Sequence, residues 1–202
     1  MRVVASVSAL AEYLPDDIAS FLARYQSVRV SLDEAVSTAI VRMVREGAAD
    51  IGVLWDAADL SGLQTVPYRS DRLCAVVHPD HALAGATETS FAETLAWPSI
   101  GVTPGGMMES MLRRQAALLG ATLTPRIQVA SLDAARRIAA AGLGLAILPA
   151  EATMPWGGAS GLVAVPLADD WARRQFVVCS RPDSMLSASS KLLVGHLCAR
   201  SR

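Results

Sequence analysis

Apolar side chains recur along this chain with two spacings, which predict strands alternating with helices. In the first 55 residues, strands are expected at 2–7, 28–32 and 50–55. The helix after the first strand carries an apolar stripe formed by Leu14, Ile18, Phe21 and Tyr25. The next helix is expected to begin with Ser37 as its N-cap and to end before Gly47. Because βαβ crossovers are right-handed, this order predicts a parallel sheet.

A second series of the same kind begins near residue 97. Its strands are expected at 97–102, 126–129 and 145–148, and its helices at 107–119 and after the N-cap Ser131. The remaining predicted elements are strands at 66–68, 72–79, 162–166 and 175–180, a short helix capped by Ser90, a glycine-rich loop at 157–161 and a terminal helix at 187–198. The predicted fold class is therefore α/β, with two Rossmann-like subdomains.

The last strand and helix have no sheet of their own, so we expect them to return to the first half. Subdomain I is predicted at 1–70 plus 176–202 and subdomain II at 71–175, with crossover strands near 69–78 and 171–178. Two crossings by strands would form a hinge. A cleft between two such halves is a natural ligand site.

Composition excludes several classes of protein. Apolar residues make up 52% of the chain and charged residues 18%, as in a globular protein, and the net charge is −1 without a basic run. This chain by itself is therefore not expected to bind DNA. It shows no leader peptide and no apolar run long enough for a membrane, so a cytoplasmic location is expected. Cys74, Cys179 and Cys198 are expected to be free buried thiols, with a redox-sensing pair as the alternative.

Several short strings carry a family resemblance. They are Leu14-Pro15, Gly47 followed by Asp50–Val53, Gly62-Leu63, Val76–Leu83, Pro104-Gly105, Ser131-Leu132 and Ala141–Pro149. Together they resemble the effector-binding domain of LysR-type transcriptional regulators from one end to the other. The resemblance implies a periplasmic-binding-protein type II-like fold that binds a small metabolite in the cleft. It also implies a dimer or tetramer, and DNA contact only through an N-terminal winged helix-turn-helix that this chain lacks.

No catalytic constellation is visible, so no enzyme activity is expected. The sequence has no nucleophile elbow, P-loop or complete dinucleotide fingerprint. His78 and His81 flank a predicted surface turn and have no neighbouring ligand residues, so neither a metal nor a cofactor is expected.

Short hydroxyl residues stand beside three predicted helix starts. They are Ser8, Ser37 and Thr103. Unpaired N–H groups at helix N-termini favour an anion, so we expect a small carboxylate there; plain helix capping is the alternative. Trp55 is expected to face the apolar part of the ligand, with a cover over the core as its alternative role. In relatives the matching positions contact effectors, which gives the full predicted site: Ser6, Ser8, Ala9, Ser37, Trp55, Thr103, Pro104 and Gly105.

The favoured function is thus an effector-sensing and oligomerisation domain, with a transporter's solute-binding protein as the alternative. A small enzyme on the same fold is a third hypothesis, which lacks a visible acid, base or nucleophile. Family resemblance suggests antiparallel helix pairing between subunits, through 14–25 and 111–119.

Overall fold

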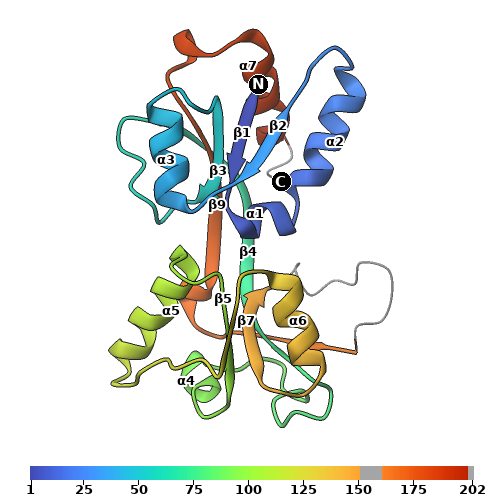
Figure 1. Ribbon diagram of the computed structural model, residues 1–202, viewed down its shortest axis with the longest axis vertical. Coiled ribbons are helices and arrows are strands. Elements are labelled where there is room, and N and C mark those ends of the chain that lie inside the picture. The colour runs from blue at the N-terminus through green and yellow to red at the C-terminus, as the bar shows by residue number, and fades with distance from the viewer. Residues whose placement is uncertain (151–160, 200–202) are drawn as a thin grey trace. The chain divides into compact units, whose positions relative to one another are not determined.

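The structure is a computed structural model that describes residues 1–150 and 161–199 (Figure 1). The chain forms two compact units, unit 1 with Met1–Ser70 and Arg174–Arg202 and unit 2 with Asp71–Arg173. Of the glycine-rich loop predicted at 157–161, all but Gly161 lies outside the described residues.

Unit 1 is built on three parallel strands, β1 (Arg2–Ala5), β2 (Ser31–Glu34) and β3 (Ile51–Trp55). β1 lies in the middle, where Val3 is in register with Leu32 on one side and Ile51 on the other. The C-terminal strand β9 (Arg173–Ser180) adds to β3 in the antiparallel direction, and β4 (Gln64–Val77) lies next to β9. The predicted parallel βαβαβ unit is therefore confirmed, with two further strands beside it.

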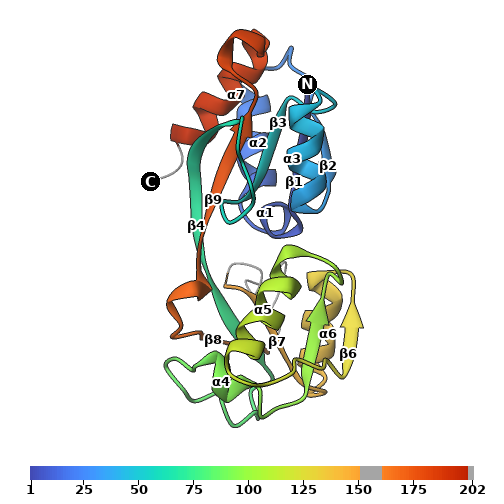
Figure 2. The same cartoon turned by 90° about the vertical axis from the view of Figure 1, so that its left-hand side faces the viewer.

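Helices cover both faces of this sheet (Figures 1 and 2). Side chains that alternate along β1 divide between two cores, Val3 and Ala5 in one and Val4 in the other. The first core is closed by α2 (Leu14–Arg24) and by α7 (Ala188–Ala199). The second is closed by α3 (Ser37–Arg45), through Ile40, Val41 and Val44. Burial on both faces explains the near-continuous apolar runs of these strands.

Unit 2 repeats the pattern with β5 (Ser99–Val102), β6 (Ile127–Val129) and β7 (Leu145–Pro149), all parallel, with β5 in the middle. β4 pairs with β7 and with β8 (Val163–Pro166), in both cases antiparallel. The helices in the described part of this unit are α4 (Phe91–Thr94), α5 (Met107–Leu118) and α6 (Leu132–Ala140), and a 3-10 turn spans Asp170–Ala172. Thus β1 lies between β2 and β3 in unit 1, and β5 lies between β6 and β7 in unit 2.

Several local predictions are confirmed by their hydrogen bonds. The Ser90 hydroxyl accepts from the Glu93 N–H while the Glu93 carboxylate accepts from the Ser90 N–H, which is a complete capping box. Ser131 caps α6 by accepting from the Ala134 N–H at 3.1 Å. Gly142 ends α6 with a φ of 71°. A Cβ on Gly144 would lie 2.6 Å from the Pro98 carbonyl oxygen, so this turn requires glycine.

Other predictions were displaced. The strand predicted at 28–32 lies instead at Ser31–Glu34, as β2. Val28 and Val30 produced the alternating pattern because both pack against the core, but the chain pairs with β1 only after them. An additional helix, α1 (Val7–Ala11), precedes α2, the helix that carries the predicted apolar stripe and has Pro15 in its first turn. The strand pieces predicted at 66–68 and 72–79 are one continuous strand, β4.

Candidate functional site

The predicted site residues of unit 1 follow the carboxyl ends of its parallel strands. Ser6 comes directly after β1, Ser37 lies three residues after Glu34, the last residue of β2, and Trp55 ends β3. Two hydrogen bonds join these ends: the Ala35 N–H donates to the Ala5 carbonyl and the Ser6 N–H donates to the Val53 carbonyl, both at 3.0 Å. In doubly wound sheets, ligands bind at this edge, where the chain order reverses around the first strand.

Ser6, Ser8 and Ala9 form one turn of chain at this edge. Ser6 has the extended backbone of an N-cap, but its side chain makes no capping hydrogen bond, and its Oγ atom is buried without a partner in the described part of the chain. Ser8 and Ala9 lie inside α1 and are 5% and 4% exposed. The Ser8 hydroxyl therefore does not mark the helix start as expected from the sequence.

Ser37 is the first residue of α3 and not its N-cap, so that prediction was wrong. Val36 takes the N-cap position, with φ −72° and ψ 150°, because pairing with β1 holds the chain extended through Ala35. Ser37 is 6% exposed, and none of the hydrogen bonds found among residues 1–150 and 161–199 involves its hydroxyl. By contrast Ser131, which follows β6 in unit 2, does cap its helix.

Trp55 is half-buried and lies in register with Phe176 of β9. Its side chain packs against the core cluster that contains Val53 and Phe176. Trp55 thus covers part of the core and stays partly exposed where β3 ends.

Arg174 is a member of this site that sequence reasoning missed. It is 3% exposed, and its Nη1 atom donates to the Ser8 hydroxyl oxygen at 3.5 Å. Its Nη2 atom lies 3.8 Å from Glu12 Oε1, and the guanidinium carbon lies 5.2 Å from the centroid of the Phe176 ring. No local signal in the sequence indicated this residue, because β9 returns from the far end of the chain to lie beside β3.

Thr103, Pro104 and Gly105 form the equivalent turn of unit 2, after β5. Thr103 has a φ of 50°, a strained value for a β-branched residue. Its N–H donates to the Val129 carbonyl at 2.9 Å, its carbonyl accepts from the Gly106 N–H at 2.9 Å, and its hydroxyl donates to the Ala130 carbonyl at 3.4 Å. Strain of this kind persists where surrounding bonds enforce it, and it is frequent at functional sites.

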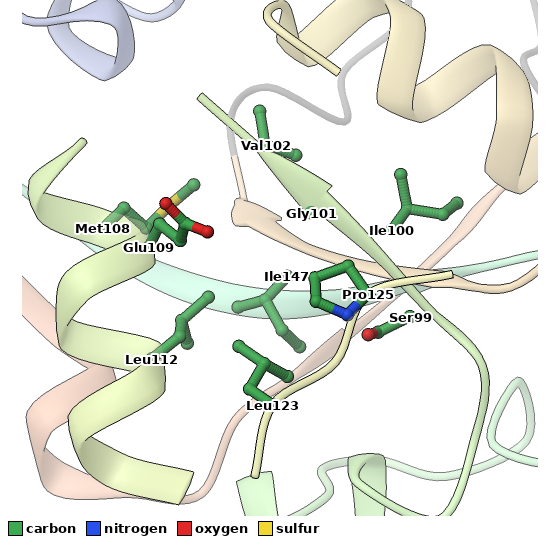
Figure 3. Close-up of a pocket in the computed structure, with 10 residues that line it drawn as sticks. All are labelled: Ser99, Ile100, Gly101, Val102, Met108, Glu109, Leu112, Leu123, Pro125 and Ile147. Carbon is green, nitrogen blue, oxygen red and sulfur yellow. The ribbon is translucent and has the colours of Figure 1, made fainter. Parts of the chain in front are cut away.

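A carboxylate of the protein already occupies the start of α5. Glu109 Oε2 accepts from the Gly105 N–H at 2.7 Å, and Glu109 Oε1 accepts from Arg113 Nη2 at 2.7 Å and from Gln128 Nε2 at 3.2 Å. These bonds, the Gly105 N–H first, lower the pKa of Glu109. Figure 3 shows this carboxylate extending from α5 toward β5. The start of α5 is therefore less available to an anionic ligand than the sequence suggested.

Two small cavities lie within unit 2. One, of about 20 Å³, is lined by Gly101, Met108 and Glu109 among others (Figure 3). The other, of about 100 Å³, lies beside Phe91, Trp97 and Thr122. Both are smaller than the pockets that usually hold metabolites, and neither includes a predicted site residue.

The described residues contain no group of three or more His, Cys, Asp or Glu side chains that could hold a metal ion. His81 Nδ1 accepts from the Leu83 N–H at 3.1 Å within its turn, and burial lowers the pKa of His81. None of the three cysteines forms a disulfide; Cys74 and Cys179 are buried and Cys198 is half-buried. No helix in the described part of the chain has both the length and the apolar character needed to cross a membrane.

Comparison with known proteins assigns the family. The sequence profile of the LysR substrate binding domain matches residues 1–201. The chain belongs to this family. It is a LysR-type effector-binding domain, and its family comprises regulatory domains, in agreement with the resemblance found in the sequence.

Solved structures of LysR-type domains share its fold. The regulatory domain of CcmR from Synechocystis PCC6803, in complex with 2-PG, superimposes with a TM-score of 0.88 at 18% identity, over 100% of this chain and 97% of that one. The BenM effector binding domain with its effector benzoate gives a TM-score of 0.81 at 20% identity, over 98% and 89%. The periplasmic-binding-protein type II-like fold class is thus confirmed.

A curated relative is a probable nitrogen assimilation transcriptional activator of Synechococcus elongatus. It is 23% identical over 178 residues, which are 87% of this chain and 57% of the relative. The LysR-type domain described here thus spans little more than half the length of that protein.

Proposed function

We propose that this domain senses a small organic anion, most simply a carboxylate, in the cytoplasm. The anion is held by the hydroxyls of Ser6, Ser8 and Ser37, beside Ala9, and its apolar part faces Trp55. Binding changes the domain and thereby controls DNA binding and transcription by the full-length regulator, through a helix-turn-helix outside this chain. The related domains CcmR and BenM are seen with 2-PG and with benzoate, respectively.

One observation carries the proposal: the hydroxyls at the ends of β1 and β2 cap no helix. Ser37 lies inside its helix, and the side chain of Ser6 makes no capping bond although its backbone is in the N-cap conformation. Plain capping, the alternative weighed for Ser37, does not account for its hydroxyl, because Val36 is the N-cap of α3. A buried hydroxyl without a partner costs free energy, about 1–3 kcal/mol, which a ligand would recover.

The charges around these hydroxyls also support an anion. Arg174 contacts Ser8 and is paired with the buried Glu12, whereas the carboxylates of Glu34 at the end of β2 and of Asp56 after β3 are exposed to water, which screens them. In unit 2, Glu109 occupies the Gly105 N–H. The start of α5 is therefore left out of the proposed anion site.

The test is calorimetry with a panel of aliphatic and aromatic carboxylates on wild type and on a Ser8→Ala/Ser37→Ala variant. Each lost charge-assisted hydrogen bond should cost about 1.5–3 kcal/mol, or more than tenfold in Kd. Ser184→Ala, an exposed serine, is the matched control and should bind like wild type. A best ligand that is neutral or cationic, or that binds the double variant as tightly, would contradict the proposal.

We also propose that the domain self-associates through α2 and α5. The C-terminal end of α5 exposes two large apolar side chains, Leu118 at 71% and Leu119 at 51%. Leucine side chains exposed to water are typical of a surface that a partner covers, and a twofold interface between two copies of the domain would bury them. Light scattering should show a dimer or tetramer, and Leu118→Ser/Leu119→Ser should shift it toward the monomer. A wild-type protein that stays monomeric at high concentration would exclude this interface.

A further inference from the structure

Arg174 is the buried cation of the candidate site, and its surroundings fix its orientation. The guanidinium is held over the face of Phe176, 5.2 Å from the ring centroid, and both residues are at most 3% exposed. Glu12 lies on one side, with 3.8 Å between Nη2 and Oε1. Ser8 lies on the other side, with 3.5 Å between Nη1 and Oγ. The ion pair of Arg174 and Glu12 carries no net charge, but its positive end faces the Ser8 hydroxyl.

This contact determines what the Ser8 hydroxyl can bind. A serine hydroxyl has one donor hydrogen and two acceptor lone pairs, whereas a guanidinium group only donates. Arg174 therefore occupies a lone pair of Ser8 Oγ and turns the O–H away from itself. Among residues 1–150 and 161–199, no acceptor for this O–H is found, although Ser8 is 5% exposed. Nearby, the buried Ser6 Oγ also has no partner in that part of the chain.

We infer that Arg174 is a specificity-determining residue, which acts through Ser8 to make the site prefer a carboxylate over its neutral amide. This inference rests on the proposed function and adds the origin of its charge preference. The positive charge strengthens the hydroxyl as a donor and attracts an anion across a short, poorly screened distance. Glu12 has the opposite effect, because its negative charge offsets part of the attraction.

The experiment uses acetate and acetamide, which have nearly the same shape and differ in charge, so it does not depend on knowing the effector. Both are titrated into the ¹⁵N-labelled domain while the amide signals of Val7, Ser8 and Ala9 are followed. In wild type, acetate should shift these signals at lower concentration than acetamide. Arg174→Gln should weaken acetate about tenfold and leave acetamide within about twofold.

Three further variants separate charge from structure. Arg173→Gln removes the same charge from an exposed neighbour and should behave like wild type. Arg174→Lys keeps the charge and should keep the preference for acetate. Glu12→Gln should move in the opposite direction and strengthen acetate binding by about threefold. A purely structural role of the ion pair would make the Arg174→Gln and Glu12→Gln variants fail alike, with acetate and acetamide weakened together.

The outcomes distinguish this inference from the proposed function. If acetate shifts the Ser8 signal equally in wild type and Arg174→Gln, the inference is overturned while the hydroxyl site stands. If acetate shifts only signals away from Val7–Ala9, both are overturned. If Arg174→Gln does not fold, the sign of the Glu12→Gln effect decides: weaker or unchanged acetate binding overturns the inference.

Discussion

At the scale of single residues, the proposed site rests on buried serines whose hydroxyls cap no helix. Ser8 and Ser37 are 5% and 6% exposed and cap no helix, whereas Ser90 and Ser131 are more exposed and cap α4 and α6. Ser8 and Ser37 thus differ from the capping serines in their hydrogen bonds. Arg174 brings a positive charge into contact with Ser8.

Glu109 gives a pH-dependent prediction at this scale. Its bonds to the Gly105 N–H and Arg113 lower its pKa in the folded state, so its contribution to stability is complete above the pKa of the unfolded chain and is lost as pH falls through the lower, folded value. Glu109→Gln should reduce the free energy of unfolding by about 1–2 kcal/mol at pH 7. In urea titrations the difference from wild type should shrink below the usual pKa of glutamate, near 4.5.

The exposed Glu34→Gln variant is the control for Glu109 and should leave unfolding unchanged at both pH values. A loss of stability in Glu109→Gln that is as large in acid as at neutral pH would show that the carboxylate charge is not its cause.

At the scale of elements, α3 packs so closely against the sheet that one added carbon atom would disturb the contact. Gly52 in β3 lies under α3 and beside β9, where an added Cβ would come 2.7 Å from both Cys179 Sγ and the Ile40 side chain. Burial at the same place raises the pKa of Cys179 to about 11, so its thiol is protonated at neutral pH. The sheet and α3 therefore fit without space for a methyl group.

Gly52→Ala should accordingly destabilise the protein by about 1–3 kcal/mol through overpacking. Gly85→Ala is the matched control, because a Cβ there would meet no atom within 4 Å and its φ is not positive. Thermal unfolding of both variants measures the difference. Equal melting temperatures for Gly52→Ala and wild type would mean that α3 moves away from β3 at little cost.

Most elements were predictable because their signals are local. Turn glycines such as Gly142 and caps such as Ser131 depend on neighbouring residues only. The displaced elements depend on distant residues: the start of β2 is set by its pairing with β1, and the N-cap of α3 moves to Val36 for the same reason. The contact of Arg174 with Ser8 was not predictable, because the two residues are 166 positions apart in the sequence.

At the scale of the whole molecule, the chain leaves unit 1 and returns to it at two anchored points. Arg69, just before the first boundary, pairs with the buried Asp17 at 3.2 Å, and Tyr68 donates to the same carboxylate at 2.6 Å. Arg174, just after the second, pairs with Glu12. Both acids belong to the segment that begins with Ser6 and Ser8. A ligand bound to these serines would therefore act on the same segment that holds both connections between the units.

The central claim is that an anionic effector binds at the carboxyl ends of β1 and β2 in unit 1. The most direct measurement is a crystal structure of the domain grown with the carboxylate that binds most tightly in calorimetry. The predicted result places the carboxylate oxygens within hydrogen-bonding distance, about 2.5–3.0 Å, of the Ser8 and Ser37 hydroxyl oxygens, with Trp55 against the apolar part of the ligand. A ligand bound away from these serines, or with its carboxylate on the Thr103 turn alone, would contradict the claim.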